Sequence, residues 1–362
     1  MDYKQRQRRL QGLLEPSHLD ALLVTHLPNI RYLCGFSGSA GALIVTEERC
    51  VFLTDGRYTE QARDEVKGAK VNVLSKSPLA GAADWLRENR RTLGRKRLGV
   101  EATHLCVADH GGLKKNLGSS FHLRPAPALM ERMRMVKDAE EIACIRSAVM
   151  LGAGLLDRAL QTIRAGVSET EVAAEMEYTA RQRGADGMSF DTIVASGPRS
   201  ARPHGRASSS PIPPKGFVVC DFGVILAGYC SDMTRTVHVG SPARADQDLY
   251  EAVRDAQHAA VQAVRPGISV AEVDQSARSV LKKRGLGRYF THSTGHGVGL
   301  EIHEPPRIAV GHNEVLQPGM VITIEPGAYV AGRGGVRIED MVLVVEGGCE
   351  VLTPSPKELI TI

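Results

Sequence analysis

The stretch VVCDFGVILAGYCSDMTRT, residues 218–236, contains two apolar segments separated by a short turn, and each segment carries one aspartate. Folding the stretch about Leu226 and Ala227 places Asp221 directly opposite Asp232. Facing side chains of paired strands lie about 4.5–5.5 Å apart at Cβ. Two ionised carboxylates at that distance repel each other unless one is protonated or a cation lies between them. The stretch therefore predicts a β-hairpin with one acidic face.

A second stretch, IEPGAYVAGRGGVRIED (residues 324–340), predicts the same arrangement. Glycines near its middle suit a turn, and folding about Gly332 puts Glu325 opposite Glu339. Either hairpin alone could simply carry polar residues on a strand face. Both together predict four carboxylates, two from each hairpin, at a site that attracts cations.

The segment HSTGHGVGLEIHE (residues 292–304) alternates glycines with other residues and carries three histidines. Its glycines resemble part of a phosphate-binding loop, but a dinucleotide fingerprint lies between a strand and a helix. Here Pro305 and Pro306 follow, and prolines do not continue a helix. We therefore reject a nucleotide loop and predict that His296 supplies a nitrogen ligand to the same cation site.

Length and composition limit the class of protein. With 362 residues, of which 43% are hydrophobic and 24% charged, the chain is long enough for two domains. The net charge of +4 is small, and the basic clusters at 4–9 and 94–97 lack interleaved aromatic residues. They are typical of solvated surface rather than of a nucleic-acid site. No apolar run suits a signal peptide or a membrane span, so we expect a soluble cytoplasmic protein without membrane or nucleic-acid partners.

The pattern along the chain changes once. From about 20 to 125, short apolar runs alternate with segments that suit helices, which indicates an α/β domain. We predict a first domain over 1–128, a linker over 129–137 and a second domain over 138–362.

The second domain has helical and strand-like segments in two successive sets. Residues 138–163 and 172–184 have helical spacing, and Ser168 with Glu171 forms a capping box. Strand-like segments follow, then a helical stretch over 246–284, then further strands. The two sets suggest an internal duplication.

The residues gathered so far resemble a known metal site. The motifs CDFG, SDMTRT, STGHGVGLEIHE, TIEPG and GVRIED are similar to those of the pita-bread peptidases, which include methionine aminopeptidase, aminopeptidase P and prolidase. Upstream, LPNIRYLCGFSGSAGALIVT and FLTDGRYTEQA resemble the creatinase-type N-terminal domain of aminopeptidase P and prolidase. The resemblance covers nearly the whole chain. It implies an α+β fold, in which a smaller α/β creatinase-type N-terminal domain precedes a C-terminal pita-bread catalytic domain.

The resemblance also implies how the ligands divide between two metal ions. Asp221 chelates one ion, Asp232 and Glu339 bridge the two, and His296 with Glu325 holds the second. Four carboxylates and one imidazole form an oxygen-rich site, which favours manganese. Cobalt, zinc and iron stay open as alternatives.

The catalytic roles follow from the same resemblance. Two ions about 3.5–4 Å apart activate a water molecule and polarise the scissile carbonyl. Glu325 is expected to act as general base, His303 to stabilise the tetrahedral intermediate and His204 to orient the peptide carbonyl.

Three further residues are candidates for binding substrate. His292 is expected to line the cleft. Arg337 shares a strand face with Glu339, so it either supports that ligand or meets the substrate. Arg307 pairs either with a substrate carboxylate or with a structural acid.

The implied activity is hydrolysis on the amino side of proline in short peptides, by a homodimer. Proline lacks an amide hydrogen, so a dedicated enzyme is reasonable. Release of the first residue from longer peptides and cleavage of Xaa-Pro dipeptides both stay open. Another dimetal amidohydrolase or a lyase on this fold is the alternative. A non-catalytic binding protein is disfavoured because all five ligands are present.

Overall fold

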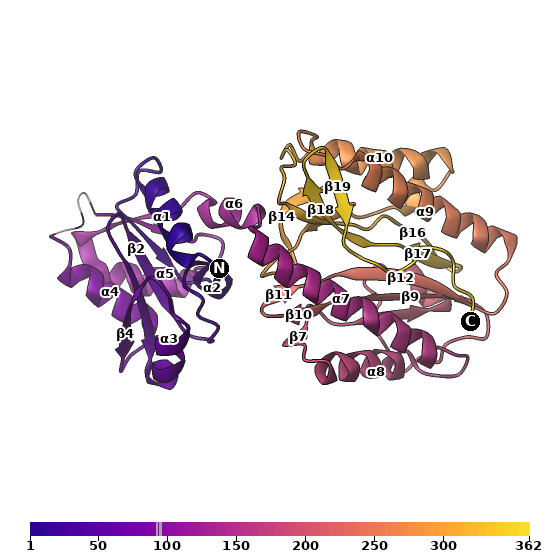
Figure 1. Ribbon diagram of the computed structural model, residues 1–362, viewed down its shortest axis with the longest axis horizontal. Helices are drawn as coiled ribbons and strands as arrows, with labels where there is room; N and C mark the ends of the chain where they lie inside the picture. Colours follow the sequence, from indigo (N-terminus) through magenta and orange to yellow (C-terminus); the bar gives the residue numbers. More distant parts are fainter. Residues whose placement is uncertain (92, 94–95) are drawn as a thin grey trace. The chain divides into compact units, whose positions relative to one another are not determined.

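The computed structural model describes residues 1–91, 93 and 96–362, so part of the basic cluster at 94–97 lies outside the described residues. The chain forms two compact units, Met1–Arg134 and Met135–Ile362 (Figure 1). The segment 129–137, expected to be a linker, contains helix α6, and the boundary between the two units falls within it. Among the described residues, no helix is long and apolar enough to cross a membrane.

The first unit is an α/β fold around a six-stranded sheet with the strand order β4-β3-β2-β1-β5-β6. Strand β2 pairs antiparallel with both neighbours, and the remaining pairs are parallel, so the α/β prediction is right. Its strands are β1 (Ala21–Val24), β2 (Ala42–Thr46), β3 (Cys50–Asp55), β4 (Lys70–Leu74), β5 (Arg97–Val100) and β6 (His122–Pro125). Its helices are α1 (Tyr3–Leu14), α2 (Leu27–Cys34), α3 (Thr59–Glu65), α4 (Pro78–Glu88), α5 (Val107–Leu117) and α6 (Leu129–Met135).

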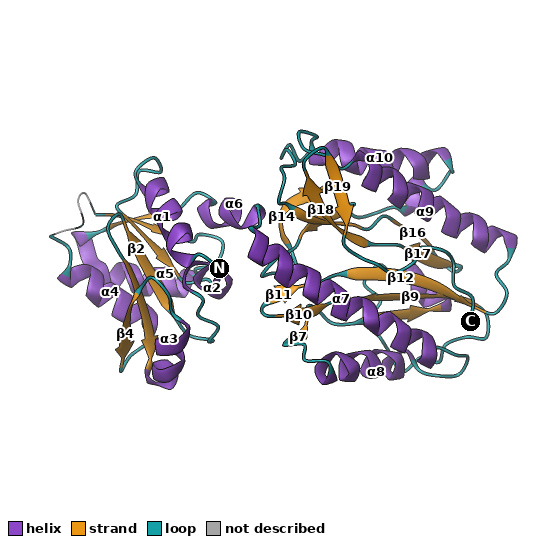
Figure 2. Ribbon diagram, viewed as in Figure 1, coloured by secondary structure: helices purple, strands orange, loops and turns teal. Residues whose placement is uncertain are grey.

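The second unit consists of two successive halves, each with a helix pair followed by strands (Figure 2). The first half holds α7 (Ala139–Thr162), α8 (Glu169–Gln182), β7 (Gly187–Met188), β8 (Ile193–Ser196), β9 (Gly216–Phe222), β10 (Val224–Leu226), β11 (Tyr229–Cys230) and β12 (Met233–Val239). The second half holds α9 (Arg244–Ala263), α10 (Val270–Lys283), β13 (Gly295–Gly297), β14 (Glu304–Ile308), β15 (Val321–Ile324), β16 (Gly327–Val330), β17 (Gly334–Arg337), β18 (Asp340–Val345) and β19 (Gly348–Val351).

The two halves repeat local details as well as element order. Helix α8 begins with the capping box predicted at Ser168 and Glu171, and α10 begins with the same box at Ser269 and Glu272. The glycine two residues before each serine donates its backbone N–H to an apolar residue farther along, Ile212 in one half and Leu316 in the other. These matching bonds support the internal duplication expected from the sequence.

The helical stretch expected over 246–284 is two helices, not one. Helix α9 ends at Ala263, and α10 begins at Val270. Between them Pro266 lacks the N–H of a helix interior, and Gly267 adopts a φ of 85°. This break lets α10 fold back against α9.

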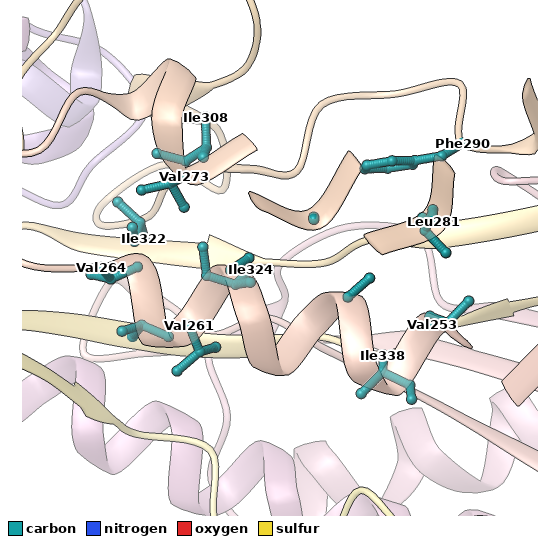
Figure 3. Close-up of a cluster of buried hydrophobic side chains, with 14 of the residues drawn as sticks. Val253, Val261, Val264, Val273, Leu281, Phe290, Ile308, Ile322, Ile324 and Ile338 are labelled. Atoms are coloured by element: carbon teal, nitrogen blue, oxygen red, sulfur yellow. The ribbon is translucent and has the colours of Figure 1, made fainter. Parts of the chain in front are cut away.

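Each half buries the outer face of its sheet beneath its helices. Cys220 and Phe222 of β9 belong to the core under α7 and α8, and Ile322 and Ile324 of β15 belong to the core under α9 and α10. Figure 3 shows the second core, with valines of α9 and α10 beside these isoleucines. Because side chains alternate across a strand, Asp221 between Cys220 and Phe222 points away from the helices. The inner sheet faces are therefore free to build a polar site.

Candidate metal centre

The first hairpin has a different register from the predicted one. Strands β9 and β12 pair so that Thr234, not Asp232, faces Asp221. The turn is formed by Ala227 and Gly228, with φ of 50° and 79°, and two-residue turns of this kind match the twist of paired strands. The predicted direct opposition of the aspartates is therefore wrong. They are diagonal neighbours, two residues apart in register, and so they still share one face of the sheet.

The second hairpin has the predicted register. Ile324 faces Asp340 in the β15–β18 pair, and Gly327 faces Arg337 in the β16–β17 pair. Glu325 and Glu339 lie between these two ladders in the same register, and both line one cavity of about 950 Å³. Four carboxylates thus meet at this cavity, two from each half of the unit.

His296 enters the site on the short strand β13, which packs between β14 and β15. A Cβ atom on neighbouring Gly295 would lie 1.9 Å from the carbonyl oxygen of Thr323, so only glycine allows this close approach. The His296 Nε2 atom lies 3.6 Å from a carboxylate oxygen of Asp232 and 3.6 Å from one of Glu325. These separations exceed a hydrogen bond and suit donors that share a cation.

The hydrogen bonding of His296 fixes the tautomer that a metal requires. Its Nδ1 atom lies 3.0 Å from the carbonyl oxygen of Gly297. Because a carbonyl only accepts, Nδ1 carries the proton and the Nε2 lone pair faces the carboxylates. Burial lowers the pKa of His296 to about 4, so the ring is neutral at physiological pH.

The carboxylates have the chemical character of ligands for a divalent cation. Oxygens of Asp221, Asp232 and Glu339 are buried without a hydrogen-bond partner within the described part of the chain. Burial raises the pKa of Asp232 and of Glu339 well above the usual range, and repulsion from neighbouring carboxylates adds to it. Ligand atoms of Asp232, His296 and Glu339 lie within 4.8 Å of one another. Unpaired buried oxygens and a neutral imidazole therefore fit a divalent cation.

Arg337 contacts one candidate ligand directly and a second one through a threonine. Its Nη2 atom donates to Asp221 Oδ2 at 2.5 Å, and its Nε atom donates to the Thr234 hydroxyl at 3.0 Å. That hydroxyl donates to Glu339 Oε2 at 2.8 Å. Of the two roles expected for Arg337, support of ligands is the one these contacts favour. Its direct partner is Asp221, however, and it reaches Glu339 through Thr234.

His292 is held by a chain of hydrogen bonds that leads back to Arg337. Arg337 Nη1 donates to the Tyr329 hydroxyl at 2.7 Å, and the hydroxyl lies 2.9 Å from His292 Nε2. His292 Nδ1 lies 2.8 Å from the carbonyl oxygen of Ser293. Nδ1 therefore donates and Nε2 accepts from Tyr329. Burial and the charge of Arg337 lower the pKa of His292 to about 4, so it lines the cavity as a neutral ring.

All ten candidate site residues line this one cavity of about 950 Å³. They are His204, Asp221, Asp232, His292, His296, His303, Arg307, Glu325, Arg337 and Glu339. His204, His303 and Arg307 are exposed. The His303 ring nevertheless lies close to the candidate ligand His296, with 4.4 Å between the ring centroids. The site thus has a buried ligand cluster and an accessible set of polar side chains.

Several residues of the site were missed at the sequence level. Thr234 and Tyr329 link Arg337 to its partners, and the Thr323 hydroxyl accepts the His296 backbone N–H at 3.1 Å. The available signal was their position on the ligand-bearing strand faces. The cavity is also lined by unpredicted residues, namely Phe190, Asp191, Ile193, Pro203, Arg206, Ser293, Ile302, Glu304, Pro305, His312 and Glu314.

Comparison with known proteins identifies the class. Residues 143–346 match metallopeptidase family M24, and the chain belongs to this family. Residues 6–136 match the creatinase/prolidase N-terminal domain. The protein is therefore an M24 metallopeptidase of the kind that carries this N-terminal domain, which confirms the resemblance and the α+β fold predicted from the sequence.

Individual relatives match over the full length. The Xaa-Pro dipeptidase of Pyrococcus furiosus is 38% identical over 359 residues, which are 99% of this chain and 100% of that one. The structure of the Xaa-Pro dipeptidase from Bacillus anthracis has a TM-score of 0.95 at 39% identity and covers 100% of both chains. The X-Pro aminopeptidase structure from Thermotoga maritima has a TM-score of 0.89 at 34% identity, over 99% of this chain and 100% of that one.

Removing one ligand should remove the metal. Glu339→Ala is expected to lose bound divalent metal and peptidase activity together, because Glu339 supplies one of the unpaired buried oxygens. Metal content after dialysis, measured by mass spectrometry, tests this. Glu346→Ala is the charge-matched control. Glu339 directly precedes strand β18 and Glu346 directly follows it, but Glu346 is exposed, so this variant should keep both metal and activity. Wild-type metal content and activity in Glu339→Ala would overturn the ligand assignment.

The metal-free protein should lose stability as pH rises. Burial raises the pKa of Glu325 from 4.5 to about 7, so between these values the folded chain keeps a proton that the unfolded chain has lost. The free energy of unfolding therefore falls through this window, by on the order of 3 kcal/mol. In Glu325→Gln this contribution is absent. Urea unfolding of chelator-treated protein between the two pH values should give a flatter profile for the variant, and equal slopes would contradict the assignment.

Proposed function

We propose that this metallopeptidase is an Xaa-Pro peptidase, which hydrolyses the bond on the amino side of proline in short peptides. The observation that carries the proposal is the meeting of four carboxylates and His296 at one cavity, where three buried carboxylate oxygens lack a partner within the described residues. The relatives named Xaa-Pro dipeptidase, which match this chain from end to end, support the choice of substrate.

We assign the metal site to Asp221, Asp232, His296, Glu325 and Glu339, with two ions per subunit. The predominance of carboxylate oxygen over nitrogen favours manganese. Bound ions of this kind supply an activated water nucleophile and polarise the scissile carbonyl. The protein holds the five ligand side chains in place. Arg337 hydrogen-bonds directly to Asp221, and it reaches Glu339 through the hydroxyl of Thr234.

The remaining groups divide the proton transfer and the substrate contacts. We assign Glu325 as the general base, because its carboxylate lines the cavity beside the imidazole of His296. His204 and His303 are accessible from the same cavity. We assign His204 to the peptide carbonyl and His303 to the tetrahedral intermediate, and His292 to the cleft wall.

Arg307 favours a dipeptidase. It faces His296 across the β13–β14 pair, its side chain is exposed in the cavity, and no ion pair of Arg307 occurs within the described residues. The structural-acid interpretation therefore has no partner to support it, whereas a free guanidinium suits the carboxylate of a dipeptide. The likeness to an X-Pro aminopeptidase structure makes that enzyme the second candidate. For assembly and location we propose a homodimer in the cytoplasm, on the analogy with two-domain relatives.

The substrate proposal is tested with matched peptides. Enzyme stripped with chelator and reloaded with manganese should cleave Ala-Pro faster than Ala-Pro-Ala, measured by release of alanine. A preference for Ala-Pro-Ala would indicate an aminopeptidase with room beyond proline. Cleavage of neither peptide would reject the proposed function and direct attention to another amidohydrolase or a lyase.

The role of Arg307 is tested by removing its charge. Arg307→Gln should raise the KM for Ala-Pro by about 10- to 100-fold, because a hydrogen bond to a charged group contributes about 1.5–3 kcal/mol, and should change Ala-Pro-Ala less. Arg206→Gln is the matched control, since Arg206 lines the same cavity but pairs with Asp191. Equal effects of the two substitutions would remove Arg307 from the substrate-binding residues.

A further inference from the structure

Glu169 and Asp274 of the second unit have no part in the metal centre and are nevertheless completely buried. The side chains of Glu169 and Asp274 are 0% exposed. Neither belongs to the lining of the metal-site cavity. Burial of a charge is costly unless the charge is paired and hydrogen-bonded, so the donors that surround each carboxylate are held firmly.

Glu169 begins helix α8 and binds both ends of one loop. Before the loop, Ser196 donates its backbone N–H at 2.8 Å and its hydroxyl at 2.9 Å to Oε1. After the loop, Ser208 donates its N–H at 3.1 Å and its hydroxyl at 2.8 Å to Oε2. Arg199 Nε lies 3.1 and 3.0 Å from the two oxygens. Five donor atoms thus converge on one carboxylate.

The loop closed in this way, residues 197–207, carries His204 at the cavity. Arg199, already bound to Glu169, also donates to the backbone oxygen of Arg206 at 2.8 Å. On the cavity side, Arg337 donates to the backbone oxygen of Pro203 at 2.9 Å. His204 is therefore flanked by two residues whose backbone oxygens are fixed by arginines.

Asp274 of helix α10 makes the same kind of contact in the second half. Thr294 donates its N–H at 3.2 Å and its hydroxyl at 2.7 Å to Oδ1. Arg278 Nε donates to Oδ2 at 2.6 Å, and the same guanidinium donates to the backbone oxygen of His292. Thr294 lies midway between His292 and His296, so this carboxylate holds the segment that carries both.

The two arrangements are of the same kind, although Glu169 is the first residue of α8 and Asp274 is the fifth residue of α10. Each carboxylate stands on the second helix of its half, each accepts both the N–H and the hydroxyl of one Ser or Thr, and each pairs with an arginine. We propose that Glu169 and Asp274 are positioning residues, which fix His204 on one side of the cavity and His292 with His296 on the other. The part that concerns His204 rests on the proposed function. A misplacement of about 1 Å in a catalytic group can lower the rate about 100-fold.

The Glu169 contact is tested by Glu169→Gln. The amide keeps the size of the side chain but turns an NH₂ group toward N–H and hydroxyl donors. The variant should lower kcat for Ala-Pro at least tenfold with little change in KM and normal manganese binding. Because Glu169 acts through His204, the double variant Glu169→Gln/His204→Ala should be no slower than His204→Ala alone. An additional loss in the double variant, or full kcat in Glu169→Gln, would overturn the proposal.

Two controls separate positioning from general loss of stability. Val172→Ala removes buried apolar surface one turn along the same helix, and it should lower the melting temperature while keeping kcat. Ser208→Ala leaves the carboxylate intact and removes one hydroxyl donor, so it should give a smaller fall in kcat that also disappears in the His204→Ala background. This milder variant decides the question if Glu169→Gln does not fold.

The Asp274 contact is tested by metal affinity and by a measurement independent of activity. Asp274→Asn should weaken manganese binding about 10- to 100-fold in calorimetric titration, whereas Glu169→Gln should not. Amide hydrogen exchange should become faster at 197–207 only in Glu169→Gln and at 290–296 only in Asp274→Asn. If wild-type enzyme fails to cleave Ala-Pro, the proposed function fails, and exchange still tests the contacts. Unchanged exchange in both variants would reject them.

Discussion

The electrostatic constraint of the second unit is that four carboxylates are gathered where water is largely excluded. Among the described residues, Asp221 is the only one of the four that forms an ion pair with an arginine. Burial and repulsion between neighbouring carboxylates raise the pKa values of Asp232 and Glu339, and burial raises the pKa of Glu325. Ionised carboxylates at this distance repel one another. They are held together by the two hairpins, by the close approach of β13 that its glycines allow, and by the hydrogen bonds of Arg337.

The grouping of the candidate ligands was predictable because a register error of an even number of residues leaves each side chain on its own face of the strand. The first hairpin turns at Ala227 and Gly228, one residue later than the predicted turn at Leu226 and Ala227. This shifts the register by two residues. An even shift leaves every side chain on its own face, and Asp221 and Asp232 therefore stayed partners. The second hairpin, rich in glycine at its turn, was predicted in register.

The supporting residues could not be found in the same way. Thr234 contacts Glu339 across 105 positions of sequence, and no local periodicity reports such a pair. Glu169 and Asp274 lie within amphipathic helices, where an acidic residue ordinarily faces solvent. Their burial follows from how each helix packs against the end of a strand. Pro266 and Gly267 are sequence signals for the end of a helix, but they lie inside the stretch 246–284 that was predicted as helical throughout.

The duplicated architecture divides the ligands between its halves. Asp221 and Asp232 come from the first, and His296, Glu325 and Glu339 come from the second. Neither half alone holds the whole of the proposed coordination set, so on this assignment the free energy of metal binding would also be free energy of association between the halves. A bound metal would then act as a non-covalent cross-link within a single chain. Metal binding would be coupled to the cooperativity with which the second unit folds, as well as to its chemistry.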